Sequence, residues 1–554
     1  MALVRFSFQR PPRVVAPLED EVFDQFTGWQ TIPISGAFKG SNLRFRVEGE
    51  RATIDPETGV LSVCTDCFDE GRTLRVIAEN SAGEAAQVIR VTTERDNALA
   101  ETQVTRDITV DGITFTFRTP AEVGHFFTGG AGEGDPFVIG PVELVSYTPK
   151  PRRVGGVLDL NGAMLNPPCA TKQGYHGWVS KDGSPKRRSS YREVRNVGRR
   201  LPLPLTPGDS LVVAISNPTA ENTNQLANRF VVLSCLKDEP AADSFRPPYS
   251  GPRKPLYRLS QVQTRHLTNL QSIASPAPPT AQAVNTQFAR FVLDTVPNWE
   301  RNAYNTRLHP PLYGRDLCVT DAAAYLWVNS ERPLEDKAYA AAGLIQRGID
   351  RYGVIESARA QGLQQPWQPD GGHNAGRKFS IMFAGLLLGN RNMINLRAST
   401  RDLKGEFQED GMTFYVTPEI VAVSNSDAWK PPYRKRKDRP KQPYTDGMVG
   451  IPDWRGKARA EHVNAAWSGH PYRISGNNNA QHGQVLSILA MGLREAWGNE
   501  AYFDYHMRFV EIARGAPDPW RFQGGSQARY NPVEGARTLK PRPGWQIHWK
   551  SPWA

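Results

Sequence analysis

The chain has 554 residues, enough for roughly three to four domains of about 150 residues each. Its 67 Lys and Arg residues outnumber its 56 Asp and Glu residues, and the net charge of +11 favours anionic partners such as nucleic acid, acidic polysaccharide or a negatively charged cell surface. No run of about 18 apolar residues is present, so no membrane insertion is expected.

The N-terminal segment MALVRFSFQRPPRVV lacks the continuous apolar core and the small-residue cleavage site of a Sec signal peptide. We therefore expect the chain either to stay in the cytoplasm or to leave the cell by another route, such as lysis with a virus particle. An extracellular or virion location fits the second route.

Residues 1–97 are predicted to form a small all-β module. Apolar and polar residues alternate along 43–47 and 74–78. Between them, the turn Ile54-Asp-Pro-Glu-Thr-Gly-Val60 precedes a strand that ends in Asn80-Ser-Ala-Gly83. This pairing resembles the immunoglobulin-like and cadherin-like repeats of bacterial surface and phage proteins. The resemblance implies an Ig-like β-sandwich that acts as a spacer or adhesion unit.

The five cysteines are sparse and give no metal-site pattern. Cys64 and Cys67 form one C-x-x-C pair without a second pair, which disfavours zinc, and we assign this pair no role. Cys169, Cys235 and Cys318 lie far apart and are expected to be thiols. No metal and no cofactor is predicted.

Residues 98–258 are predicted to form a second β domain, either a β-sandwich or a barrel. Alternating residues on both sides of Asp111-Gly112 indicate a hairpin, and further short apolar runs continue the pattern. The aromatic and basic stretch Tyr175–Arg192 suits a sugar-binding surface, although ordinary loops explain the same residues and we favour loops. The Pro-rich stretch Phe245–Pro255 is predicted to be a linker at a domain boundary.

Residues 259–554 are predicted to be helical, with the clearest amphipathic stripe in the longest helix. The loops between the helices are long and rich in polar and aromatic residues, which suits a ligand cleft at one end of a helical scaffold. The expected helices are Leu259–Ile273, Ala283–Leu293, Cys318–Val328, Glu335–Arg359, Gly376–Leu388, Ala480–Trp497 and Ala501–Ala513.

The most informative stretch is the loop Asp370-Gly-Gly-His-Asn-Ala-Gly-Arg-Lys378, which opens directly into an apolar helix. We expect it to present polar side chains at the mouth of the helical core, where they suit recognition of an anion and proton transfer beside it. The alternative is a Gly-rich helix entry in which His373 is a cap and Arg377 forms an ion pair.

Two further clusters of this kind are Trp467–Arg473 and Asn477–Gln484, and a smaller one is Tyr313–Asp316. The mixture suits β-elimination on a uronic-acid polymer, which needs a base near neutral pKa and groups that stabilise charge on the substrate carboxylate. A glycoside hydrolase would need two positioned carboxylic groups instead, and the acidic residues of this region leave hydrolysis open.

Each residue type in these clusters has an expected role. The base is His373 or His482, and Tyr472 is the candidate acid for the leaving group. The predicted substrate-binding residues are Asn374 and Asn478 at the uronate carboxylate, Arg377 and Arg473 along the polymer, and Lys378, Arg315, Trp367 and Trp467.

The segment Gln346–Gly353, then Trp367 and the loop that ends at Lys378, resembles uncharacterised bacterial α/α-toroid proteins that are similar to polysaccharide lyases. Phe245–Tyr249 fits the same group. The resemblance implies an α/α-toroid-like, glycan-active domain over residues 259–554. It supplies no catalytic assignment, and the chain shows fewer helices than a complete six-hairpin toroid needs.

The preferred hypothesis is a surface or virion-associated protein, of phage tail-fibre or tail-tip type, that binds and depolymerises an acidic polysaccharide or bacterial surface glycan. The alternative is a non-enzymatic adhesion protein of a phage particle, used for receptor binding and host attachment. Other tail proteins are expected partners, and a homo-oligomer would fit such an appendage. Nucleic-acid binding, suggested by the basic run Lys430–Lys441, ranks last because no nucleic-acid-binding motif accompanies it.

Overall fold

A computed structural model describes most of the chain. The described residues are 9–24, 29–49, 52–64, 72–94, 99–127, 134–155, 158–170, 172–179, 185–186, 191–216, 227–271, 280–281, 284, 288, 294, 314–369, 373–426, 444–454 and 479–513. They divide into two compact units. Unit 1 comprises Met1–Leu99 with Ala241–Asp243 and Arg258–Arg265, and unit 2 comprises the remainder.

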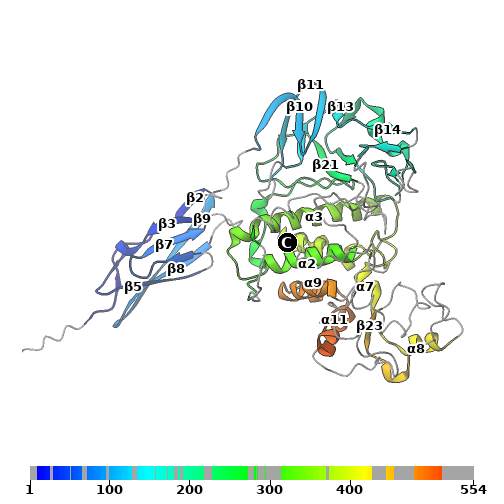
Figure 1. Ribbon diagram of the computed structural model, residues 1–554. Coiled ribbons are helices and arrows are strands. Elements are labelled where there is room, and N and C mark those ends of the chain that lie inside the picture. Colours follow the sequence, from blue (N-terminus) through cyan, green and yellow to red (C-terminus); the bar gives the residue numbers. More distant parts are fainter. Residues whose placement is uncertain are drawn as a thin grey trace, which may run out of the picture. The chain divides into compact units, whose positions relative to one another are not determined.

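Unit 1 is all-β, as the alternating pattern predicts, and it forms a β-sandwich, as the resemblance to Ig-like repeats implies (Figure 1). One sheet has the strand order β2-β9-β8-β5, and the other has the order β3-β7-β6. Their bounds are β2 Glu21–Asp24, β3 Trp29–Pro33, β5 Arg44–Glu48, β6 Ala52–Ile54, β7 Val60–Cys64, β8 Arg72–Asn80 and β9 Gly83–Glu94. Apolar side chains from both sheets, including Phe45, Leu61 and Val76, bury one common core.

Unit 2 contains a single eight-stranded sheet with the order β16-β20-β21-β12-β11-β13-β19, and β10 pairs with β11. The bounds are β10 Thr102–Val110, β11 Ile113–His125, β12 Pro136–Ile139, β13 Val142–Thr148, β16 Ala163–Leu165, β19 Leu203–Leu205, β20 Ser210–Ser216 and β21 Ala227–Leu236. Its two end strands contribute Ala163 and Leu205 to one buried cluster, so the sheet curves around its core as a half-barrel. The predicted hairpin is confirmed, with positive φ at both Asp111 and Gly112.

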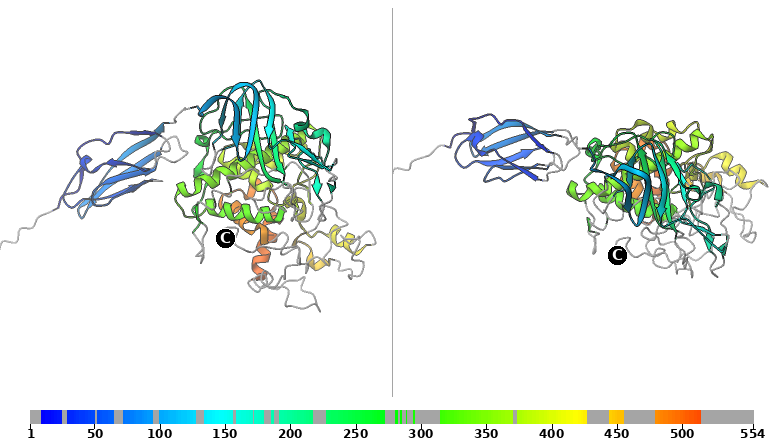
Figure 2. Two further views of the ribbon diagram at one scale, coloured as in Figure 1. Left: turned by 45° about the horizontal axis from the view of Figure 1, so that its top comes forward. Right: turned by 90° about the horizontal axis from the view of Figure 1, so that it is seen from above.

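The helices of unit 2 lie on one side of this sheet (Figures 1 and 2). The longer ones are α2 Gly314–Val328, α3 Leu334–Ala360, α4 Lys378–Leu387, α9 Asn479–Ala490 and α11 Glu500–Ala513. Shorter ones are α5 Arg391–Ile394, α6 Leu396–Ser399, α7 Gln408–Met412, α8 Pro418–Asn425 and α10 Arg494–Trp497. A closed toroid is not established by these described helices, and none of them is long and apolar enough to cross a bilayer.

Two predicted helices differ from the structure. The described part of Leu259–Ile273, residues 259–271, contains only the 3-10 turns η4 Leu259–Gln261 and η5 Thr264–His266, because Asp243 accepts the backbone N–H groups of Leu259 and Ser260. The predicted helix Ala480–Trp497 breaks at Gly492, whose φ of 68° ends α9 and leaves α10 as a separate turn. The predicted helix Ala283–Leu293 lies almost entirely outside the described residues.

The first part of the predicted linker, Phe245–Ser250, packs in the interior of unit 2, and its remainder to Pro255 is partly exposed. The guanidinium of Arg246, 3% exposed, lies between Asp135 at 2.7 Å and Asp350 at 2.6 Å. It therefore joins the start of β12 to α3 by buried ion pairs. Prolines prevent a stretch from forming regular helix or sheet ladders, but such a stretch can still be packed, as the buried part of this one is.

Candidate functional site

The loop that precedes α4 is held by three consecutive side chains of α7. Gln408 Oε1 accepts the backbone N–H of Asn374 at 3.0 Å, and Glu409 Oε1 accepts that of Gly376 at 2.7 Å. Asp410 forms an ion pair with Lys378 at 2.7 Å. Backbone groups at a glycine-rich helix entry have no helical partners, and α7 supplies the missing acceptors.

Arg377 belongs to a buried network of charges. Its guanidinium donates to Asp294 at 3.1 Å and to the carbonyl oxygens of His373 and Ala375. Arg351 on α3 bridges Asp294 at 2.9 Å and Asp321 of α2 at 3.2 Å. The alternative interpretation, in which Arg377 forms an ion pair at the helix entry, is therefore confirmed, although the N-cap residue of α4 is Arg377 itself and not His373.

Lys378 is also enclosed, with 0% exposure. Its ammonium donates to the carbonyl oxygen of Trp497 at 2.6 Å and lies 4.0 Å from the centre of that indole ring. Burial lowers its pKa, and the neighbouring Asp410 opposes that shift. The charged ends of Arg377 and Lys378 thus have internal partners that fix the loop, rather than lying exposed at its mouth.

The loop and the start of α9 both contact Cys318. Ala375, Cys318 and Ala480 form one buried apolar cluster. The thiol of Cys318 lies 3.5 Å from Gln484 Oε1, and Gly376 packs so closely that a Cβ there would lie 3.1 Å from Cα of Cys318. Two of the polar clusters singled out in the sequence are therefore brought together at one end of the helices.

Glu409 is the ionisable group at the centre of this region. It is 2% exposed, and burial raises its pKa to about 7. Its second oxygen, Oε2, has no hydrogen-bond partner among the described residues. It lines an enclosed cavity of about 10 Å³, room for one water molecule, together with Gln481 and His506.

Two histidines lie side by side at that cavity, and His506 is the one that lines it. The ring centres of His482 on α9 and His506 on α11 are 5.3 Å apart. Burial lowers the pKa of both groups, so both imidazoles are neutral at pH 7. The Nε2 atom of His482 is enclosed and has no hydrogen-bond partner within the described chain. A neutral imidazole with an unused nitrogen has the state required of a proton acceptor.

The other predicted site residues divide into two groups. Asn374 is 1% exposed, and its amide donates to the carbonyl oxygen of Gln368; Trp367 is 0% exposed and stacks on Phe407. Arg315 lies in the first turn of α2, but its side chain is outside the described atoms. Tyr472, Arg473, Asn478 and Trp467, and the basic run Lys430–Lys441, lie outside the described residues.

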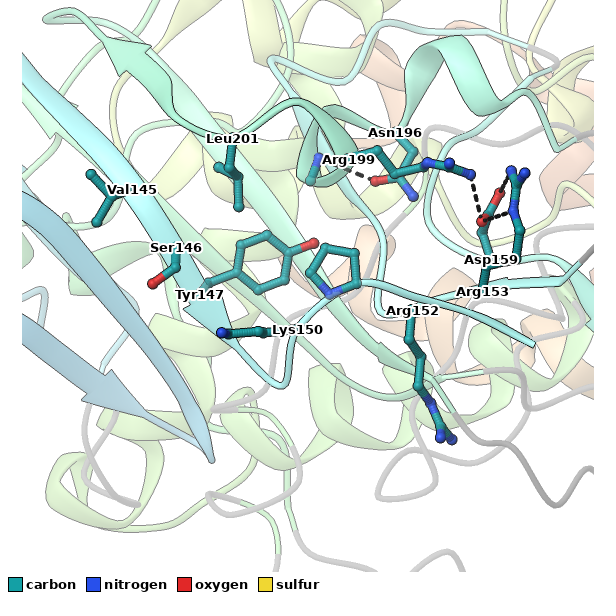
Figure 3. Close-up of a pocket in the computed structure, with 12 residues that line it drawn as sticks. Val145, Ser146, Tyr147, Lys150, Arg152, Arg153, Asp159, Asn196, Arg199 and Leu201 are labelled. Atoms are coloured by element: carbon teal, nitrogen blue, oxygen red, sulfur yellow. Dashed lines mark hydrogen bonds and ion pairs between the residues drawn. The ribbon is translucent and has the colours of Figure 1, made fainter. Parts of the chain in front are cut away.

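The half-barrel sheet carries an open basin of about 420 Å³ (Figure 3). Its walls come from β13, the hairpin of β14 Arg152–Val154 and β15 Leu158–Leu160, and the 3-10 turn η3 Val197–Arg200. Four cationic side chains line it, Lys150, Arg152, Arg153 and Arg199. Asp159 is the carboxylate among them.

The sequence patterns missed Glu409 and the basin for the same reason. A carboxyl pKa near 7 depends on burial, and the four cations come from segments whose proximity depends on the sheet. One sequence feature could have pointed to Glu409. The run Gln408-Glu-Asp410 places three adjacent hydrogen-bond acceptors downstream of a loop whose backbone N–H groups have no helical partners.

Comparisons with known proteins give local matches. No family model and no curated protein matches the chain. A Bacteroides fragilis structure assigned as an alpha-galactosidase is 20% identical over 17% of this chain and 19% of its own length, with a TM-score of 0.13. Titin domain M7 is 13% identical over 16% of this chain and 99% of its own, with a TM-score of 0.13.

A longer match is to titin domains Z1Z2 in complex with telethonin, 12% identical over 42% of this chain and 98% of that one, with a TM-score of 0.15. The neighbours thus include Ig-like domains, but at these TM-scores they carry no argument about function. Among the residues that the structure describes, no group of three or more His, Cys, Asp or Glu side chains is placed to hold a metal ion.

Proposed function

We propose that this protein binds an acidic polysaccharide and that its helical region cleaves the polymer by β-elimination. The observation that carries the proposal is that Glu409 and His506 line one small cavity and that the ring of His482 lies against the ring of His506. A carboxyl whose pKa burial raises to about 7, beside a neutral imidazole with an unused nitrogen, is typical of acid–base centres.

In the proposed reaction, a base takes the proton α to the uronate carboxylate. The bond to the glycosidic oxygen on the β carbon breaks, a double bond forms between the α and β carbons, and the leaving oxygen receives a proton. No water is consumed. His482 is assigned as the base because its imidazole is neutral with a free Nε2 atom.

Glu409 has a supporting part in this scheme. With a pKa of about 7, its carboxyl is about half protonated at neutral pH, and the protonated form donates a hydrogen bond. Such a donor stabilises the charge that develops on the substrate carboxylate as the proton leaves. Asn374, Arg377 and Lys378 then act by holding the loop, and Tyr472, Arg473 and Asn478 keep their predicted roles, while the role of base goes to His482 in place of His373.

Incubation of the purified chain with alginate, polygalacturonate and hyaluronan tests this function. Absorbance of the unsaturated product, recorded beside the number of new reducing ends, separates the reactions. The proposal expects both signals to rise together on one polymer. New reducing ends without absorbance would instead identify a hydrolase.

A second candidate function is adhesion without turnover. It is favoured by the Ig-like sandwich of unit 1 and by the internal partners of Arg377 and Lys378. In this case the chain binds the polymer, neither product signal rises, and the protein is an attachment component of a phage tail. Both candidate functions share three further proposals: an extracellular or virion location, tail-protein partners and a homo-oligomeric state.

A further inference from the structure

We infer that the basin on the half-barrel sheet is a separate binding site for a carboxylate-bearing sugar residue, with Lys150 and Arg152 as its charged contacts. The inference rests on the proposed polysaccharide ligand but not on cleavage. It assigns a binding role to a part of the chain that the acid–base centre does not use.

The basin is built around a buried carboxylate. Asp159 is 2% exposed, and its oxygens accept Arg153 at 3.0 and 3.2 Å, Arg199 at 2.9 Å and the hydroxyl of Tyr191 at 2.6 Å. Burial opposes its ionisation, but the hydrogen bonds from Arg153 and Tyr191 outweigh burial and hold the pKa of Asp159 below its usual value.

Two of the four cations are therefore neutralised in the folded protein. Arg153 and Arg199 share Asp159, and each also pairs with Glu193, at 2.6 and 2.9 Å. Figure 3 shows both guanidinium groups turned toward Asp159, whereas Lys150 and Arg152 are directed away from it. Lys150 and Arg152 are exposed and have no anionic partner among the described residues.

The uncharged part of the basin is rigid. The hydroxyl of Tyr147 donates to the carbonyl oxygen of Asn161 at 2.6 Å, and a Cβ on Gly198 would lie 2.1 Å from that hydroxyl. Pro151 and Leu201 complete an apolar wall beside the tyrosine ring. Two cations that are unpaired within the described chain, beside an apolar wall, suit a ring that carries one carboxylate, and about 420 Å³ lies within the usual range of ligand sites, roughly 300–1,000 Å³.

The test is calorimetric titration of full-length protein with defined oligosaccharides of alginate, polygalacturonate and hyaluronan. All variants are made in the His482→Ala protein, so that the ligand is not cleaved during the titration. The double variant Lys150→Ser/Arg152→Ser is compared with Lys237→Ser/Arg401→Ser, which removes two exposed cations outside the basin. Circular dichroism confirms that both variants fold.

We expect the basin variant to bind one oligosaccharide roughly tenfold to a hundredfold more weakly than the His482→Ala protein does. The control variant should bind it as tightly as the His482→Ala protein. Equal losses in both variants, displacement by duplex DNA of equal charge, or no binding by the parent would each overturn the site. The cleavage assay on the same variants with active His482 reports the proposed reaction separately, so either idea can fail while the other stands.

Discussion

The backbone N–H of Gly376 donates a hydrogen bond to Glu409 Oε1 at 2.7 Å, so the loop before α4 rests on a carboxyl that is itself buried. This contact links the most distinctive motif of the sequence to an ionisable group that the motif does not contain. It also makes the protonation of Glu409 measurable through the stability of the fold.

Replacing Glu409 by Gln should remove one pH-dependent component of stability. The pKa of Glu409 is raised from 4.5 to about 7, so the unfolded chain ionises this group first, and its contribution to stability falls as pH rises from 4.5 to about 7. The free energy of unfolding of Glu409→Gln minus that of the parent should therefore grow by roughly 3 kcal/mol over this window. Urea unfolding at a series of pH values measures it; a difference that stays constant would contradict the burial-raised pKa.

Replacing Arg377 by Met should destabilise the fold. The change leaves Asp294 with Arg351 as its remaining ion-pair partner in the described network, and it removes donors from the carbonyl oxygens of His373 and Ala375. Loss of one partner of a buried ion pair costs about 3–5 kcal/mol. Thermal and urea unfolding measure the loss.

The matched control is Arg391→Met, because Arg391 is exposed on α5 and should change stability by no more than about 0.5 kcal/mol. An Arg377→Met protein with parental stability that no longer binds polymer would return Arg377 to the substrate-binding role expected from the sequence.

Replacing Gly348 by Ala should separate α3 from α4. A Cβ at this position would lie 2.3 Å from the carbonyl oxygen of Ser380 and 2.4 Å from Cβ of Ala384. Overpacking costs about 1–3 kcal/mol, more than the gain of about 1 kcal/mol in helix propensity. We expect the urea midpoint to fall for Gly348→Ala. It should stay unchanged for Gly447→Ala, where nothing lies within 4 Å of the added Cβ. Equal midpoints would show that the helices can move apart freely.

The sequence predicted the elements whose signals are local. The 3.6-residue stripe identified α3, and the alternating segments identified unit 1 as an all-β module. The predicted helix at Leu259–Ile273 was wrong because hydrogen bonds from the separate segment at Asp243 decide its conformation. The sequence could not choose between a closed barrel, a sandwich and the observed half-barrel, since alternation is common to all three.

The sequence predicted where the candidate site lies better than it predicted what each of its residues does. The loop at His373 and the start of α9 do meet around Cys318. The ion-pair partners of Arg377 and Lys378 are Asp294 and Asp410. No rule of sequence spacing connects either cation with its partner. Polar residues beside glycines indicate that a loop is special, but only the packed fold shows whether its charges face a ligand or one another.

The most direct test of the central claim is the initial rate of unsaturated-product formation by the parent and by His482→Ala on the same uronate polymer. The account predicts that the variant loses roughly 10²- to 10⁴-fold in rate, as expected for removal of a general base, while its urea unfolding shows that it remains folded. An unchanged rate in the folded variant would contradict the account, and so would a parent protein that forms no unsaturated product from alginate, polygalacturonate or hyaluronan.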